Sequence, residues 1–226
     1  MAFRIKITGH STNFDPQTGP PTCSVCGKAG SSVCGRCNAN TYCSTSCQKQ
    51  DWEYHRLVCS RYAIVTNDKR PDNTHFRALW LPQNKAKPLW FWLKTEKCDF
   101  DGDCLSYSSV NCRLGTSCFP ITPWEVLHEH IPQDGLAHGL MALVTPDYKK
   151  GGPQALPNES ITALLKEGQP ALYNSVIVFA YQTRTTQGSN GPSSAVVVED
   201  LKMRDFGKIV EAYQRHASIG KEASPL

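Results

Sequence analysis

The chain has 226 residues, of which 40 % are hydrophobic and 19 % are charged, and its formal net charge is +4 at pH 7. This composition excludes an intrinsically disordered chain, which would hold fewer apolar residues and more charge. No apolar run approaches the roughly 20 residues that a membrane-spanning helix needs, and the N-terminus has no long apolar segment typical of a secretory signal. We therefore expect a soluble intracellular protein of one or two domains, in the nucleus or the cytoplasm.

Residues 1–22 are expected to form an N-terminal strand and a linker. The stretch Phe3-Arg-Ile-Lys-Ile7 alternates apolar and basic side chains, a pattern typical of an edge strand. The sequence that follows, through Pro21, is rich in proline and glycine and indicates an extended or flexible connection.

Eleven cysteines are present, and seven of them lie between residues 23 and 59. An odd count in a chain without an export signal does not favour a disulfide framework. Together with one histidine, the seven have the spacing Cys23-x2-Cys26-x7-Cys34-x2-Cys37-x5-Cys43-x3-Cys47-x7-His55-x3-Cys59. Thiolate and imidazole are ligands that suit Zn²⁺, and four ligands close a tetrahedral structural site. The eight residues therefore predict two structural zinc ions per chain, with no coordination position left for a catalytic water.

The ligands fall into two kinds of local structure. Each Cys-x2-Cys pair predicts a tight turn, a knuckle, whose sulfurs face one ion, and Gly27 and Gly35 ease the backbone there. Ser44 is a candidate N-cap for a helix from Thr45 to about Val58. On that helix, ligands spaced four apart share one face, so each helical pair can complete a site opened by a knuckle.

Spacing alone leaves two groupings of the eight ligands open. The sequential grouping is Cys23, Cys26, Cys34, Cys37 and then Cys43, Cys47, His55, Cys59. The interleaved grouping is Cys23, Cys26, Cys43, Cys47 and then Cys34, Cys37, His55, Cys59. In either case a segment this short has too little core to fold alone, so we expect zinc to dominate its folding.

Zinc also changes the charge of the chain. Seven thiolates add seven negative charges and two Zn²⁺ ions add four positive ones, which lowers the formal charge from +4 to +1. The electrostatic footprint of a nucleic-acid-binding protein is then absent, so we expect no direct nucleic-acid partner.

The second half of the cysteine-rich segment has a distinctive sequence, Tyr42-Cys43-Ser44-x2-Cys47-Gln48-x2-Asp51-Trp52-x2-His55-x3-Cys59. With the two knuckles before it, residues 23–59 resemble a MYND-type zinc finger. The resemblance implies the interleaved grouping, with zinc 1 on Cys23, Cys26, Cys43 and Cys47, and zinc 2 on Cys34, Cys37, His55 and Cys59.

The resemblance also implies a protein partner, often a short proline-containing peptide, in a shallow groove beside the helix. The residues that match the groove walls are Ser44, Gln48 and Trp52, which are four apart and share one helical stripe. An aromatic ring and an amide suit recognition of an extended backbone. The alternative is that Trp52 only packs against the rest of the chain.

Residues 60–226 are long enough for a core of their own. Their patterns predict strands at Arg77–Leu81, Leu89–Leu93 and 136–144, and a short helix at Ser160–Lys166 capped by Ser160 or Asn158. They also predict a long hairpin from Leu172–Tyr181 and Ala195–Glu199, and an amphipathic helix at Lys202–His216. The fold class is thus α+β, with a two-zinc finger followed by a mainly β domain with a few helices. Short apolar motifs such as Phe76-Arg-Ala-Leu-Trp80 resemble the C-terminal part of fungal MYND-finger proteins of unassigned function.

The second region holds few candidates for chemistry. Cys98, Cys104, Cys112 and Cys118 could hold a third metal, although their spacing is longer than that of knuckles. His128, His130 and His138 are interpreted as ordinary histidines. Motifs for nucleotide binding, hydrolase nucleophiles and metalloproteases are absent, and so is the cofactor segment of SET methyltransferases.

We therefore expect a non-enzymatic, zinc-binding protein-interaction module or adaptor linked to transcriptional regulation. The alternative is an unrecognised enzyme in residues 60–226, with the finger as a docking arm. The expected partner is a protein or peptide rather than a membrane, and the sequence leaves the oligomeric state open.

Overall fold

The computed structural model describes residues 21–98, 102–114, 122–125, 139–144, 156–166, 172–188 and 191–222. The strand expected at Phe3–Ile7 lies outside these residues. The elements in chain order are β1 (Ser32–Val33), β2 (Thr41–Tyr42), α1 (Thr45–Tyr62), η1 (Asn67–Lys69), β3 (His75–Leu81), β4 (Leu89–Cys98), β5 (Gly102–Leu105), α2 (Tyr107–Leu114), β6 (Thr122–Glu125), β7 (Gly139–Val144), α3 (Glu159–Thr162), β8 (Val176–Gly188), β9 (Gly191–Glu199) and α4 (Asp205–Glu222).

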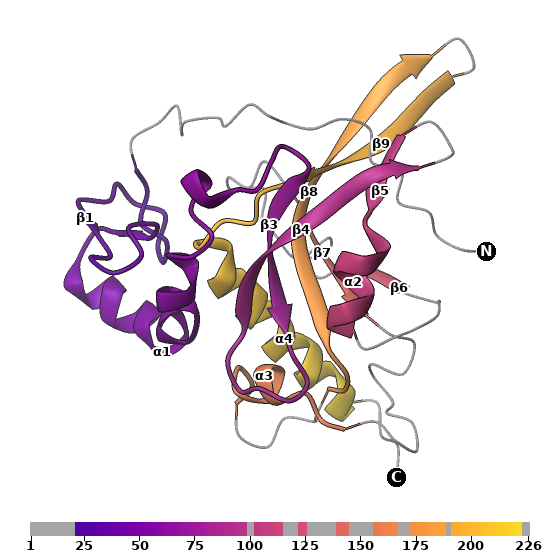
Figure 1. Ribbon diagram of the computed structural model, residues 1–226. Helices are drawn as coiled ribbons and strands as arrows, with labels where there is room; N and C mark the ends of the chain where they lie inside the picture. Colours follow the sequence, from indigo (N-terminus) through magenta and orange to yellow (C-terminus); the bar gives the residue numbers. More distant parts are fainter. Residues whose placement is uncertain are drawn as a thin grey trace.

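Within the described residues the main sheet has seven strands, all paired antiparallel, in the order β5-β4-β3-β8-β7-β6, with β9 paired to β8 (Figure 1). Strand β8 is the centre of the sheet, because it pairs with β3, with β7 and with β9 along its length. The two-stranded sheet of β1 and β2 belongs to the cysteine-rich segment.

Alternate residues of the central strands enter two different hydrophobic clusters. On β3, Leu79 and Leu81 face one cluster and Phe76 and Ala78 face the other, as expected when successive side chains of a strand point to opposite sides of the sheet. Helices α1, α3 and α4 contribute to the first cluster and α2 to the second, which gives three layers (Figure 1). Strands that are buried on both faces explain the near-continuous apolar runs in the sequence.

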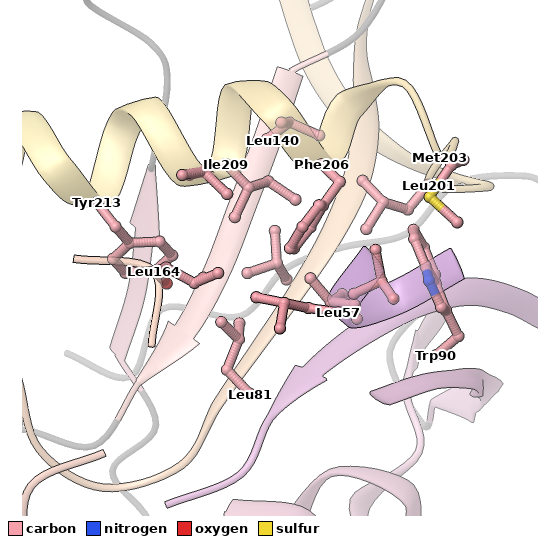
Figure 2. Close-up of a cluster of buried hydrophobic side chains, with 14 of the residues drawn as sticks. Leu57, Leu81, Trp90, Leu140, Leu164, Leu201, Met203, Phe206, Ile209 and Tyr213 are labelled. Atoms are coloured by element: carbon pink, nitrogen blue, oxygen red, sulfur yellow. The ribbon is translucent and has the colours of Figure 1, made fainter. Parts of the chain in front are cut away.

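The cysteine-rich segment is packed against the sheet rather than tethered to it. Leu57, Val58 and Tyr62 of α1 belong to the same cluster as Trp90 of β4 and the apolar face of α4, and Figure 2 shows Leu57 and Trp90 among the side chains of that cluster. The Tyr62 and Trp90 rings meet edge to face, with centroids 4.9 Å apart. The boundary expected at residue 59 therefore falls inside α1.

A buried arginine adds polar contacts to the same junction. Arg77 of β3 is 6 % exposed, and its guanidinium donates to the Tyr62 hydroxyl, to the Asn67 side-chain oxygen and, at 3.2 Å, to the Asp200 carboxylate. The guanidinium carbon lies 5.0 Å from the centroid of the Tyr62 ring. The Arg77 side chain thus connects four parts of the chain: the end of α1, η1, β3 and the residue after β9.

The α+β class is confirmed, and most predicted elements are present with altered bounds. Strands β3 and β4 and the hairpin β8-β9 are confirmed, and each is longer than predicted. Helix α3 is shorter than predicted and its N-cap is Asn158, whose side chain accepts from the amide of Ile161. Helix α4 begins at Asp205, three residues later than predicted, because a turn with the bond Asp205 N–H to Lys202 C=O precedes it.

Several of the described elements were not predicted: the short elements β1, β2 and η1, and in the main sheet domain β5, α2 and β6. Strand β5 has the sequence Gly-Asp-Cys-Leu, and α2 is rich in serine and asparagine, which are weak helix formers. Their apolar residues Leu105, Val110 and Leu114 lie in the second cluster or against it, so tertiary packing overrides weak local preference.

Candidate metal centre

The two Cys-x2-Cys knuckles have the same backbone structure. In the first, the amide of Gly27 donates to the carbonyl of Cys23 at 3.0 Å, and in the second the amide of Asn38 donates to that of Cys34 at 2.9 Å. Gly27 and Asn38 both have positive φ, 72° and 53°, the left-handed region that glycine and asparagine tolerate. The role expected of Gly27 is therefore confirmed. In the second knuckle Gly35 lies in the turn without positive φ, and Asn38 takes the left-handed position that Gly27 has in the first.

Helix α1 brings the later ligands to these knuckles. Its N-cap is Ser44, as predicted, and the Ser44 hydroxyl accepts from the amide of Cys47 at 3.2 Å. The helix runs to Tyr62, four residues beyond the predicted end, because its last turn packs in the core of the sheet.

The eight predicted ligands gather in two clusters, with the potential ligand atoms of each cluster all within 4.8 Å of one another. The grouping is the interleaved one. The first zinc cluster consists of Cys23, Cys26, Cys43 and Cys47, and the second zinc cluster consists of Cys34, Cys37, His55 and Cys59.

The distances between ligand atoms fit a tetrahedral zinc ion. Zn–S bonds of about 2.3 Å at the tetrahedral angle require about 3.8 Å between sulfurs, and a Zn–N bond of about 2.0–2.1 Å requires about 3.5 Å between sulfur and nitrogen. In the first zinc cluster the Sγ atoms of Cys26, Cys43 and Cys47 are 3.5, 3.6 and 3.9 Å apart. The second zinc cluster shows the same fit, with 3.7 Å from Cys34 Sγ to Cys59 Sγ and 3.6 Å from Cys37 Sγ to His55 Nε2.

In each zinc cluster, backbone hydrogen bonds lower the pKa of one thiol against the effect of burial, but the pKa of another is raised, so the thiols need a cation in order to ionise together. Burial, followed by the charge of Cys37, raises the pKa of the Cys59 thiol to about 12. Hydrogen bonds, first with Cys26 and then with Cys47, raise the pKa of the Cys43 thiol to about 12. A divalent ion at the centre of each cluster reverses this preference, because it stabilises the thiolate form directly. The chain thus carries two zinc-binding clusters, one of four cysteines and one of three cysteines and a histidine.

A group of polar side chains orients the histidine ligand. His55 Nδ1 lies 3.3 Å from Asp51 Oδ2, so its N–H can donate to that oxygen and leave the Nε2 lone pair for zinc. The same carboxylate oxygen accepts from the Tyr42 hydroxyl at 2.6 Å and from the Asn40 amide at 3.0 Å. Burial lowers the pKa of His55, with Asp51 opposing, which favours the neutral imidazole that a metal requires.

These supporting residues were not predicted. Asp51 is part of the finger motif, and its position four residues before His55 on a helix is a signal that the two side chains can meet. Nothing in the local sequence indicated that Asn40 and Tyr42 share one acceptor with His55.

The predicted peptide-binding residues lie in the N-terminal half of α1 and at its N-cap, Ser44. Ser44 is exposed, Gln48 is half-buried and Trp52 is 43 % exposed. The Trp52 ring contacts the His55 ring, with centroids 5.9 Å apart and planes tilted by 36°. We call Ser44, Gln48 and Trp52 the docking stripe. In this stripe the Trp52 ring contacts the zinc ligand His55, and much of the ring surface remains accessible to solvent.

The family model of the MYND finger matches residues 23–59. These residues are a MYND finger, a zinc-binding protein-interaction module.

Relatives of this MYND finger occur in proteins with different names. The chain is 43 % identical over 58 residues to Tudor domain-containing protein 1 of Homo sapiens, which is 26 % of this chain and 5 % of that protein. It is 40 % identical over 67 residues to N-lysine methyltransferase SMYD2 of Mus musculus, and the match covers 29 % of this chain and 16 % of that protein. It is 41 % identical over 58 residues to ubiquitin carboxyl-terminal hydrolase 19 of Arabidopsis thaliana, and the match covers 25 % of this chain and 9 % of that protein. No solved structure matches the chain.

The matched segments span a small part of these relatives, so they bear on the MYND finger and not on residues 60–226. For that region, the resemblance to fungal proteins stays a prediction. The same holds for a third metal, because Cys118 and the side chains of Cys98 and Cys104 lie outside the described residues, while Cys112 is exposed on α2. His128, His130 and His138 also lie outside them. Within the part of the chain that the structure describes, no helix combines the length and apolarity needed to span a bilayer.

Proposed function

We propose that the protein is a non-catalytic intracellular adaptor whose MYND finger docks a short, extended, proline-containing peptide of a protein partner on the docking stripe. The observation that carries the proposal is the exposure of Trp52. Of the four large hydrophobic side chains that are exposed in the described part of the chain, it is the aromatic one, with 43 % of its surface accessible. Tryptophan is one of the residue types enriched among those that contribute most of the binding energy of a protein interface.

The setting of Trp52 is rigid for three reasons. Its ring rests on the imidazole of His55, which the second zinc cluster fixes. One turn before it, Gln48 is half-buried and can pair through its amide with an extended backbone. Behind it, α1 shares its core with the sheet, so residues 60–226 act as a platform for the stripe. A surface that needs no ordering on binding keeps more of its interaction energy.

The charge of the finger also favours a protein partner over nucleic acid. With both zinc ions and seven thiolates counted, Lys28, Arg36, Lys49 and Arg56 against Asp51 and Glu53 leave this segment with a formal charge of −1. A nucleic-acid site would need a basic surface instead. A link of this adaptor to transcriptional regulation is part of the proposal and follows from the partner once it is identified.

The test compares Trp52→Ala with the wild type on an array of proline-containing peptides, followed by affinity measurements on the peptides that the wild type binds. A central tryptophan contributes about 2 kcal/mol or more, so we expect the variant to bind these peptides roughly 30-fold more weakly. Ile64→Ala is the control, because Ile64 is an exposed apolar residue beyond the end of α1, away from the stripe. Native mass spectrometry should find two zinc ions in all three proteins. Equal binding by wild type and Trp52→Ala would refute the docking stripe.

A further inference from the structure

The two zinc clusters differ in their access to solvent. In the second zinc cluster all four ligands are buried, with exposures of 4 % for Cys34, 6 % for Cys37, 1 % for His55 and 0 % for Cys59. In the first zinc cluster Cys23 is buried, but Cys26 is exposed and both Cys43 and Cys47 are partly exposed. The same finger thus holds one enclosed metal centre and one that solutes can reach.

The position of each cluster on α1 explains the difference. His55 and Cys59 lie on the C-terminal half of the helix, between Leu57, Val58 and Tyr62, which belong to the core shared with the sheet. Cys47 lies in the first turn of α1 and Cys43 lies just before its N-cap, and no residue of α1 before His55 is buried. Zinc release from the second cluster would have to open part of the main core around all four ligands, whereas in the first cluster only Cys23 is buried and the other three ligands already border solvent.

We propose that the first zinc cluster is a site of reversible thiol oxidation, at which hydrogen peroxide forms a disulfide between Cys26 and Cys43 and expels one zinc ion, while the second zinc cluster keeps its metal. Cys26 is the exposed ligand, and its sulfur lies 3.5 Å from that of Cys43, the shortest sulfur–sulfur distance in this cluster among those given above. Susceptibility to oxidation follows thiolate character and solvent access, and zinc-bound cysteines are thiolates.

The step balances with peroxide as the oxidant. The Cys26 thiolate attacks one peroxide oxygen, which gives a sulfenic acid and hydroxide. The Cys43 thiolate then attacks the sulfenic sulfur, the S–S bond forms and a second hydroxide leaves. Two thiolates have lost two electrons in total and one peroxide has gained them. The ion keeps only Cys23 and Cys47 as ligands and dissociates as Zn²⁺. A dithiol reductant returns both thiolates, and zinc binds again.

The proposed step acts on the first turn of α1. Cys43 precedes the N-cap residue Ser44, and Cys47 donates its amide to the Ser44 hydroxyl, so loss of this zinc frees the turn on which the docking stripe begins. A consequent loss of peptide affinity rests on the proposed function. The zinc and disulfide measurements below do not depend on any partner, so the two proposals can fail separately.

The experiment treats the zinc-loaded full-length protein with one equivalent of hydrogen peroxide in the presence of a chromophoric zinc chelator. Native mass spectrometry counts the remaining zinc, and peptide mapping after differential thiol labelling locates the disulfide. We expect one zinc per chain to be released at least tenfold faster than the other, with a Cys26–Cys43 disulfide and with Cys34, Cys37 and Cys59 still reduced. Treatment with a dithiol and Zn²⁺ should restore two zinc ions.

Two variants keep the result unambiguous. Cys112→Ser removes an exposed thiol outside the finger that could consume peroxide, and it should release zinc as the wild type does. Cys26→Ser should form no Cys26–Cys43 disulfide; if this variant fails to load the first zinc, the time course of labelling in the wild type decides instead. Simultaneous release of both ions, earlier oxidation of the second cluster, or oxidation elsewhere with both ions retained would each overturn the proposal.

Discussion

The substitution Leu57→Ala tests whether the MYND finger and the sheet share one core. Leu57 lies between the zinc ligands His55 and Cys59, yet its side chain is 9 % exposed and belongs to the cluster that contains Trp90, Leu201 and Phe206 (Figure 2). If the finger were an independent domain, truncating this residue would leave the stability of the sheet unchanged. The shared cluster predicts the opposite.

The expected cost is that of a large-to-small change in a packed core. A buried Leu→Ala substitution destabilises a protein by about 2–5 kcal/mol through lost transfer free energy and the cavity left behind. Because Leu57 keeps a small exposed fraction, we expect about 3 kcal/mol, which lowers the Tm of a chain this long by roughly 6–12 °C.

The assay is urea unfolding of the zinc-loaded protein, followed by far-UV circular dichroism and by tryptophan fluorescence, with the zinc content counted before unfolding. Leu57→Ala should retain two zinc ions and shift a single transition that both probes report. Ile64→Ala is the matched control, since Ile64 is 53 % exposed and its truncation should change stability by less than about 0.5 kcal/mol. A Leu57→Ala protein as stable as this control, or two separate transitions of which one is unaffected, would refute the shared core.

Two further substitutions test the polar groups around the finger. Asp51→Asn removes the carboxylate that accepts from His55, so the zinc affinity of the second zinc cluster should fall about 10–100-fold, as measured by competition with a chromophoric chelator. The control Glu53→Gln, on the exposed side of α1, should leave the zinc affinity unchanged. Equal zinc affinities of the two variants would refute the role of Asp51 in orienting His55. Arg77→Met removes the guanidinium that donates to the Tyr62 hydroxyl and to Asp200, while Arg70 still pairs with Asp200. We therefore expect a loss of about 2–3 kcal/mol in urea unfolding, against a negligible loss for exposed Arg61→Met, and similar values for both would show that the Arg77 side chain does not stabilise the junction.

The metal centre was the most predictable part of the molecule. The sequence itself gives the residue types and the spacing of the ligands. The N-cap Ser44, followed by a stretch without proline or glycine, predicts the helix that carries the later ligands. The sequence could not choose between the sequential and interleaved groupings, because both satisfy the same local spacings. That choice depended on the family resemblance, and the structure shows the interleaved form.

Contacts between residues that are far apart in the sequence could not be predicted from local sequence patterns. Arg77 was predicted only as the first residue of a strand, and its partner Asp200 is 123 residues away. A charged residue next to apolar residues in a strand was nevertheless a signal, because arginine is seldom fully buried without a partner. The sequence could indicate that such a partner exists but not which of the many carboxylates supplies it.

The way in which the finger joins the sheet could not be predicted from the zinc ligands. The ligand pattern ends at Cys59, and a boundary at that point follows from chemistry alone. Yet Leu57, Val58 and Tyr62 form a second apolar face on the same helix, and two zinc ions do not use it. An apolar helical face that metal ligation leaves uncovered must be buried elsewhere, and here β4 and α4 bury it. The zinc pattern therefore defines the finger, whereas the residues between its last ligands define how the finger joins the rest of the protein.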